Sequence, residues 1–432
     1  MIGVIILEIY VVKQGDSIYS IAKAYNVTPA SIIAANELTN PDQLVVGQAL
    51  VILPENRKHV VKRRETLYLI AAQYGVTVAD IFRVNPTLSR QGLIYPGQEI
   101  IIPSNVKKLG TIEVNGYSFP NINIAILRRT LPNLTYLSIF SYEVKSDGSL
   151  TTINDVPLIQ EARNYKVAPI MVITNIQEGK GFSSQLAHDI LTNEAIQTKL
   201  IENIFTILKA KKYHGINIDF EYIFPYDKES YNNFIRKMSV RLHRTGYILI
   251  TALAPKTSAD QKGLLYEAHD YPVHGALVDR VILMTYEWGY TGGPPLPVAP
   301  LNEVQKVLNY AITAIPKGKI LMGMPNYGYD WELPYIPTRN ANTISNVEAV
   351  KRAFEFKASI KFDPTAQTPY FNYVDSAGKK HIVWFEDARS INAKLSVAHQ
   401  YGLAGVSYWT IGRYFPQNWV VLNAKFNVKK VL

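Results

Sequence analysis

The sequence has no cysteine among its 432 residues. Disulfides, thiolate metal sites and cysteine nucleophiles are therefore excluded. It also lacks an apolar run of the roughly 18–20 residues that a transmembrane helix requires. The opening segment MIGVIILEIYVV has only a short apolar run, with no preceding basic residues and no small-residue cleavage site. We therefore expect neither a secretory signal peptide nor a membrane partner.

Signals for metals, cofactors and nucleic acids are also missing. None of the eight histidines stands in an H-E-x-x-H or similar metal spacing, so we expect no metal and no cofactor. The formal net charge is +10, but the basic residues are dispersed and form no recognised nucleic-acid-binding motif. We expect no nucleic-acid partner, whereas an anionic polymer is compatible with the charge. No feature of the sequence indicates the oligomeric state.

The first 103 residues contain an internal repeat. Residues 11–36 (VVKQGDSIYSIAKAYNVTPASIIAAN) align without a gap with residues 60–85 (VVKRRETLYLIAAQYGVTVADIFRVN). Each copy ends in a run rich in Val and Ile, which favours a strand. Ser and Thr residues stand where they could cap two helices in each copy. The pattern predicts two small βααβ domains, over residues 9–54 and 58–103.

Both copies resemble LysM modules, the glycan-binding domains of cell-wall proteins. The resemblance implies that chains containing N-acetylglucosamine bind in a shallow groove, formed by the loops after the first strand and the second helix. The alternative is that the two units only pack on the rest of the chain. Two modules would raise affinity for a polymer through avidity. The groove residues implied are Gly15, Asp16, Ser17 and Ile18 in the first copy and Arg64, Glu65, Thr66 and Leu67 in the second.

From Gly110 onward, eight apolar strand-like runs recur, with segments of helical character between most of them, such as 192–211, 227–245 and 302–315. This alternation predicts a (β/α)8 TIM barrel over residues 108–432. A stretch at about 330–385 breaks the alternation and is predicted to be a small α+β insertion. The expected fold class is therefore α/β, with two βααβ modules before the barrel.

The fourth run, GINIDFEYI, has an unusual polar face. Asn217, Asp219 and Glu221 alternate with apolar residues, whereas strands of a parallel barrel usually read as continuous apolar runs. If the apolar residues face the helices, the three polar ones line the barrel interior near its carboxyl end, where barrel enzymes place their chemistry. An antiparallel strand with one wet face would give the same alternation.

Two carboxylates in one cleft suggest glycoside hydrolysis. Asp219 and Glu221 lie two residues apart on one strand and so line the same wall, instead of flanking a sugar from opposite sides. That arrangement suits a mechanism in which the substrate supplies its own nucleophile. Glu221 would act as general acid and then general base, and Asp219 would orient a 2-acetamido group whose oxygen attacks the anomeric carbon. The configuration would be retained.

The segment 214–221 resembles the D-G-x-D-x-D-x-E signature of glycoside hydrolase family 18. His214 and Asn217 replace two of its aspartates, and Asn217 is assigned a supporting role. MTYE (284–287) resembles the sixth-strand M-x-Y-D of that family, which implies that Tyr286 hydrogen-bonds the acetamido oxygen. Trp409, in SYWTIG (407–412), matches the aromatic floor that the family has beneath the reacting sugar. For Tyr117, Trp288, Tyr327 and Trp331, core and sugar-contact roles are both open. The substrate-binding residues expected are Trp409, Tyr117, Glu287, Trp288, Tyr327 and Trp331.

Two LysM modules before such a barrel resemble the cortex-lytic N-acetylglucosaminidases of endospore-forming bacteria. This implies hydrolysis of β-1,4 bonds on the reducing side of N-acetylglucosamine in spore peptidoglycan. It also implies a spore location, at the boundary of coat and cortex, after synthesis in the mother-cell cytoplasm. The alternatives are a chitinase with the same chemistry and a non-catalytic wall-binding or spore-coat protein.

Overall fold

The computed structural model describes residues 7–85, 87–88, 92–104 and 108–432, apart from the side chain of Arg83. The prediction about the opening segment thus falls largely outside the described residues. Contacts divide the chain into two compact units. Unit 1 comprises Met1–Gly110 and Pro416–Phe426, and unit 2 comprises Thr111–Phe415 and Asn427–Leu432. Within the described ranges, no helix has both the length and the apolarity needed to cross a membrane.

In unit 1, both copies of the repeat have the predicted order of strand, helix, helix and strand, and the two strands of each copy pair antiparallel. Ser17, Thr28, Thr66 and Thr77 cap the four helices through their side-chain oxygens. A helix of residues 416–425 also belongs to this unit. The elements are β1 (Glu8–Val11), α1 (Ile18–Tyr25), α2 (Pro29–Asn36), β2 (Ala49–Ile52), β3 (Arg57–Val60), α3 (Leu67–Tyr74), α4 (Val78–Val84), β4 (Glu99–Ile102) and α14 (Pro416–Lys425).

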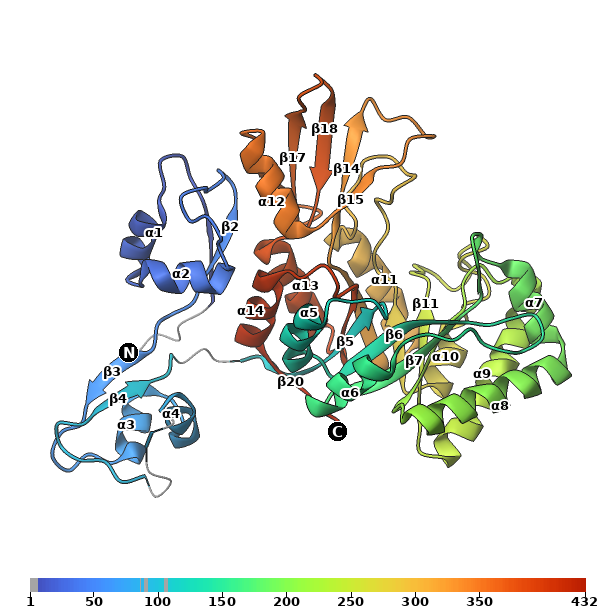
Figure 1. The fold of residues 1–432 in the computed structure, drawn as a ribbon, viewed down its shortest axis with the longest axis horizontal. Helices are drawn as coiled ribbons and strands as arrows, with labels where there is room; N and C mark the ends of the chain where they lie inside the picture. The colour runs from blue at the N-terminus through green and yellow to red at the C-terminus, as the bar shows by residue number, and fades with distance from the viewer. Residues whose placement is uncertain (1–6, 86, 89–91, 105–107) are drawn as a thin grey trace. The chain divides into compact units, whose positions relative to one another are not determined.

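Unit 2 contains a closed barrel of eight parallel strands (Figure 1), so the predicted TIM barrel is confirmed. The ring closes where the first strand pairs in parallel with the last, with Gly405 opposite Glu113. All eight predicted strand-like runs supply a strand. The strands are β5 (Gly110–Ser118), β6 (Tyr136–Glu143), β7 (Ala168–Thr174), β10 (Gly215–Asp219), β11 (Ile248–Leu253), β12 (Arg280–Leu283), β13 (Ile320–Pro325) and β19 (Gly405–Trp409).

Helices surround the barrel, and a short hairpin, β8 (Ile176–Gln177) and β9 (Gly181–Phe182), follows β7. The final strand is β20 (Phe426–Val428). The longer helices include the three predicted helical segments. They are α5 (Ile124–Thr130), α6 (Val156–Asn164), α7 (Ser184–Thr192), α8 (Glu194–Lys211), α9 (Lys228–Arg244), α10 (Tyr271–Leu277), α11 (Leu301–Ala314) and α13 (Ala388–Gln400). Single 3-10 turns occupy Leu131–Asn133, Pro225–Asp227 and Lys317–Lys319.

The predicted insertion is a five-stranded antiparallel sheet with one helix, drawn in orange in Figure 1. It begins directly after β13 and ends before α13, which explains why this stretch breaks the βα alternation. Its elements are β14 (Gly328–Leu333), β15 (Asn342–Ile344), α12 (Asn346–Glu355), β16 (Lys361–Asp363), β17 (Thr368–Val374) and β18 (Lys380–Trp384).

The two faces of β10 differ in what they contact. Asn217 is in register with Val172 of β7 and Ile250 of β11, and both of these belong to the apolar cluster inside the barrel. Phe220 points the other way and stacks on Tyr231 and Phe234 of α9. Neighbours in register on parallel strands face the same side, so Asn217 lies in the interior. The strand is therefore parallel and buried, not one with a wet face.

Candidate active site

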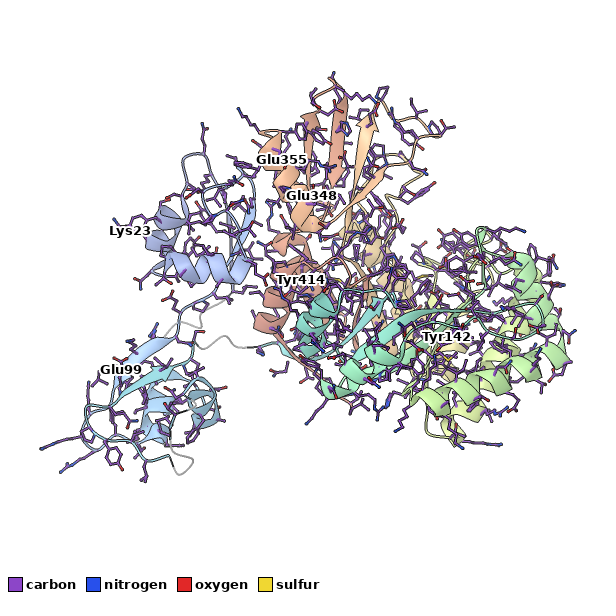
Figure 2. The ribbon with its side chains drawn as sticks, viewed as in Figure 1. Lys23, Glu99, Tyr142, Glu348, Glu355 and Tyr414 are labelled. Atoms are coloured by element: carbon purple, nitrogen blue, oxygen red, sulfur yellow. The ribbon has the colours of Figure 1, made fainter. Side chains whose placement is uncertain are left out.

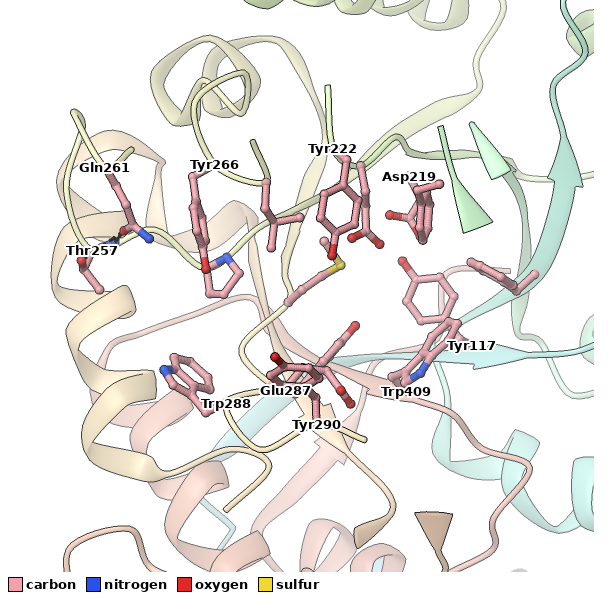
Figure 3. Close-up of a pocket in the computed structure, with 17 residues that line it drawn as sticks. Tyr117, Asp219, Tyr222, Thr257, Gln261, Tyr266, Glu287, Trp288, Tyr290 and Trp409 are labelled. Atoms are coloured by element: carbon pink, nitrogen blue, oxygen red, sulfur yellow. Dashed lines mark hydrogen bonds between the residues drawn. The ribbon is translucent and has the colours of Figure 1, made fainter. Parts of the chain in front are cut away.

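The carboxyl end of β10 opens into a cavity of about 520 Å³ (Figure 3). Asp219, the last residue of the strand, is 4% exposed, and Glu221 follows it in the cavity wall. Figure 3 shows Asp219, Tyr117 and Trp409 toward one end of the cavity and Thr257, Gln261 and Trp288 toward the other. The lining residues are Tyr117, Phe140, Phe182, Asp219, Glu221, Tyr222, Pro255, Thr257, Gln261, Leu265, Tyr266, Met284, Tyr286, Glu287, Trp288, Tyr290 and Trp409.

The backbone of Glu221 is held from a neighbouring strand. Asn175, fully buried just after β7, accepts a hydrogen bond from the Glu221 N–H (2.9 Å) and donates one to the Glu221 carbonyl (2.8 Å). On the other side, a ring nitrogen of His269 contacts the Phe220 carbonyl at 3.0 Å. Asn175 is not among the residues predicted from the sequence. Its only signal there is a polar residue at the end of the apolar run APIMVITN.

Burial shifts both carboxyl groups toward their protonated forms. It raises the pKa of Asp219 to about 7. The pKa of Glu221 lies well above its ordinary value, because of burial first and then the negative charges of Asp219 and Glu287. Desolvation and like charges both disfavour ionisation of an acid. Glu221 can therefore carry a proton at neutral pH, which a general acid requires.

Asn217 lies beneath the cavity and does not line it. Its Nδ2 donates to the Tyr117 hydroxyl at 2.5 Å. Within the described part of the chain, neither its Oδ1 nor the buried Oδ1 of Asp219 has a hydrogen-bond partner. An amide cannot ionise, so Asn217 neither repels Asp219 nor competes with it for a proton. The unpaired oxygen of Asp219 is available to a donor such as a substrate amide N–H.

Five more residues predicted for the site line the same cavity. Tyr286, Glu287 and Trp288 come from the loop after β12, and Tyr117 and Trp409 from β5 and β19. The Tyr117 and Trp409 rings meet edge to face, with centroids 5.3 Å apart. This aromatic pair and the carboxylates lie in one concave space, which is the usual form of a sugar-binding site with a few polar groups.

Two predicted sugar contacts lie elsewhere. Trp331 is 1% exposed and donates its Nε1 hydrogen to the Gly293 carbonyl at 2.9 Å, so it is a core residue. Tyr327 is also buried, and its hydroxyl donates to the Glu287 carboxylate. Tyr329 donates to the same carboxylate at 2.9 Å. These two phenols fix the orientation of Glu287, so Tyr327 acts on the cavity only through another residue.

The cavity is also lined by aromatic residues that were not predicted, including Tyr222, Tyr266 and Tyr290. Tyr222 directly follows the predicted acid, and Tyr290 lies three positions beyond Glu287, so proximity to a motif could have indicated both. Tyr266 lies in the long loop between β11 and α10, where no periodic pattern points to a site.

The predicted groove residues of the LysM modules divide into capping, exposed and buried positions. Asp16 accepts from Tyr10 and from the Lys13 N–H, and Glu65 accepts from the Lys62 N–H and contacts His59. Ser17 and Thr66 cap their helices, while Gly15 and Arg64 are exposed with positive φ. Ile18 and Leu67 are 6% and 5% exposed and belong to the module cores. Exposed Tyr19 and Tyr68 follow them.

No group of three or more metal-ligating side chains occurs among the residues that the structure describes. A parallel barrel whose cavity holds a buried acid pair and aromatic walls has the architecture of a glycoside hydrolase. The chain belongs to glycosyl hydrolases family 18, whose family model matches residues 115–413, and it carries two LysM domains, at residues 10–53 and 59–103. It is therefore a glycoside hydrolase with LysM modules.

Relatives match almost the full length of the chain. It is 49% identical to the cortical fragment-lytic enzyme of Bacillus subtilis (strain 168), over 98% of this chain and 99% of that protein. The crystal structure of the Bacillus cereus spore cortex-lytic enzyme SleL matches with a TM-score of 0.84, 41% identity and 99% coverage of both chains. A chitinase from Chromobacterium violaceum matches with a TM-score of 0.68 and 26% identity, over 72% of this chain and 98% of that one.

Proposed function

We propose that this chain is an N-acetylglucosaminidase of spore cortex peptidoglycan. It hydrolyses β-1,4 bonds on the reducing side of N-acetylglucosamine and retains the anomeric configuration. The observation that carries the proposal is the pairing of Glu221, whose pKa is strongly raised, with buried Asp219 in one cavity. The full-length similarity to cortex-lytic proteins supports the choice of polymer.

In the first step, protonated Glu221 donates its proton to the glycosidic oxygen, and the bond from that oxygen to the anomeric carbon of N-acetylglucosamine breaks, so that the reducing-side glycan leaves as an alcohol. The acetamido carbonyl oxygen of this N-acetylglucosamine forms the new bond to the anomeric carbon. Asp219 accepts a hydrogen bond from the acetamido N–H and stabilises the oxazolinium ion that forms. Tyr286 donates its hydroxyl hydrogen to the acetamido oxygen. In the second step, ionised Glu221 removes a proton from water, and the water oxygen bonds to the anomeric carbon. The bond from that carbon to the acetamido oxygen breaks, which restores the acetamido group and gives net retention.

The two LysM modules bind the same glycan and keep the enzyme on its insoluble substrate. In this proposal the protein is made in the mother-cell cytoplasm and lies at the boundary of spore coat and cortex. A fluorescent fusion expressed at its native level should label that boundary in mature spores. A signal confined to the vegetative cell surface would contradict this location.

Product analysis tests the reaction. We expect digestion of purified cortex fragments to generate new reducing ends of N-acetylglucosamine, identified by mass spectrometry after borohydride reduction. Reducing-end muramic acid alone, or no cleavage, would refute the proposal. A chitinase is the second candidate, because chitinase structures match the barrel. Chitobiose release from chitin at a higher rate than cortex cleavage would favour it.

A further inference from the structure

Helix α14 lies outside all the family matches, which cover residues 10–53, 59–103 and 115–413. It nevertheless belongs to unit 1, where it packs against α2 and β2 of the first LysM module. Gln417 makes the polar contact. Its Nε2 donates to Asn36 Oδ1 at 2.7 Å and to the Ala49 carbonyl at 2.9 Å. Gln417 and Asn36 are 8% and 5% exposed, so this contact lies in the buried interface between α14 and the module.

The second module provides an internal comparison. Asn36 bonds both backbone groups of Val51, and Asn85 bonds both backbone groups of Ile101 in the same way. The closing strands therefore correspond, with Ala49 and Val51 of the first module matching Glu99 and Ile101 of the second.

The corresponding faces of the two modules differ in burial and charge. Ala49 and Val51 are 3% and 0% exposed. The Glu99 side chain, labelled in Figure 2, is 52% exposed. It forms an ion pair with Lys58, and Ile101 is half-buried. A helix packed over Glu99 would bury an unpaired charge or displace this ion pair, whereas the methyl group of Ala49 permits close approach. Among the residues that the structure describes, the face of the first module therefore suits α14 and the corresponding face of the second does not.

The chain passes between the two units three times, at residues 110–111, 415–416 and 426–427, and the last two crossings flank α14. A module attached to this helix is thus restrained by more than one linker. Its predicted groove stays open, since Gly15 and Ser17 are exposed and neighbouring Tyr19 is 71% exposed.

We propose that the α2/β2 face of the first LysM module is a docking surface whose partner is helix α14. The first module is thereby attached to the catalytic chain through α14 as well as through its own linker, and so serves as a glycan anchor with a second attachment, for which the second module has no suitable face. The effect of this docking on activity rests on the proposed function. A held anchor raises the effective concentration of polymer at the cavity but does not affect a soluble fragment that reaches the cavity by diffusion.

The variant Ala49→Glu tests this, because it places in the first module the residue found in the second. Glu99→Ala is the matched control. Gln417→Met removes the two amide hydrogen bonds without altering the module. In Ala49→Glu and Gln417→Met we expect the backbone amides of α14 to exchange hydrogen at least tenfold faster, while the β1–β2 amides stay protected. Release of fragments from insoluble cortex should fall severalfold, and hydrolysis of soluble cortex fragments should not change.

Unchanged exchange in α14 in both variants would overturn the docking. Faster exchange with an unchanged ratio of insoluble to soluble activity would overturn the anchor role. If Ala49→Glu also exposes the β1–β2 amides, the substitution has destabilised the module itself. The exchange rates of α14 in Gln417→Met then decide whether the docking exists. Absence of hydrolysis by the unsubstituted chain would refute the proposed function alone, because hydrogen exchange does not depend on activity.

Discussion

At the residue scale, the chemistry depends on how Glu221 and Asp219 share one buried space. Burial acts on both, and Glu221 also experiences the charges of Asp219 and Glu287. The pKa values of the two groups therefore differ. Such a difference lets one carboxyl group of a pair act as the acid while the other is ionised. Neutral Asn217 beneath them adds no further charge.

Glu221→Gln keeps the size and polarity of the side chain and removes its acidic proton. We expect turnover of cortex fragments to fall by roughly 10²–10⁴-fold, the usual contribution of general acid–base catalysis. Binding to insoluble glycan should persist, since the LysM modules are unchanged. Glu202→Gln is the control, because Glu202 is an exposed residue of α8 paired with Arg241. A variant with near-normal turnover would exclude Glu221 as the acid.

Asp219→Asn should change stability in a pH-dependent way. Folding raises the Asp219 pKa from its ordinary value near 3.8 to about 7, so the native state binds its proton more tightly than the unfolded chain. The free energy of unfolding therefore decreases as pH rises from about 4 to 7, and the destabilisation is complete above pH 7. We expect the variant to be more stable than the unsubstituted protein at pH 8 and nearly equal at pH 4, measured by urea denaturation. A pH-independent difference would contradict the assigned shift.

At the element scale, neighbouring strands set the position of the acid. Strand β10 is predictable because its polar and apolar residues alternate and each set has its own environment. The position of the backbone directly after β10 depends on Asn175 after β7 and on His269 in the loop before α10. Neither residue stands out in the sequence, because each acts through a backbone group far away in the chain.

Asn175→Ala should therefore impair catalysis without touching the cavity. It removes both hydrogen bonds to the Glu221 backbone and should lower kcat by about 10²-fold, as expected for a small misplacement of a catalytic group. The free energy of unfolding should fall by about 1–3 kcal/mol. Asn203→Ala on α8 is the control, because it loses one hydrogen bond, to the Gly148 carbonyl, away from the cavity. Equal kcat losses in the two variants would show that Asn175 has no positioning role.

At the scale of the whole molecule, two binding modules act with one catalytic cavity. Tyr19 and Tyr68 occupy the same place in α1 and α3, beside the predicted grooves, and are 71% and 74% exposed. Exposed aromatic rings in these positions suit stacking on sugar rings. Because the modules are linked, each raises the effective concentration of glycan for the other.

Tyr19→Ala combined with Tyr68→Ala should weaken binding to insoluble peptidoglycan by roughly 10²-fold or more, and by far more than either single change. Sedimentation with purified cortex would measure this. Hydrolysis of soluble fragments should stay the same, and Tyr165→Ala on the barrel surface should leave both properties unchanged. Equal effects of the single and double variants would argue against joint binding.

The sequence by itself determined the two repeats, the eight barrel strands, the insertion and the inward face of β10. Each of these depends on local periodicity or capping, which neighbouring residues specify together. Only the tertiary structure decided that Trp288 lines the cavity while Trp331 lies in the core, since the two occur in nearly the same local sequence, Tyr-Glu-Trp and Tyr-Asp-Trp. It also placed Asn175 behind the acid and α14 on the first LysM module. These contacts join segments that lie far apart in the chain, and no local sequence pattern indicates them.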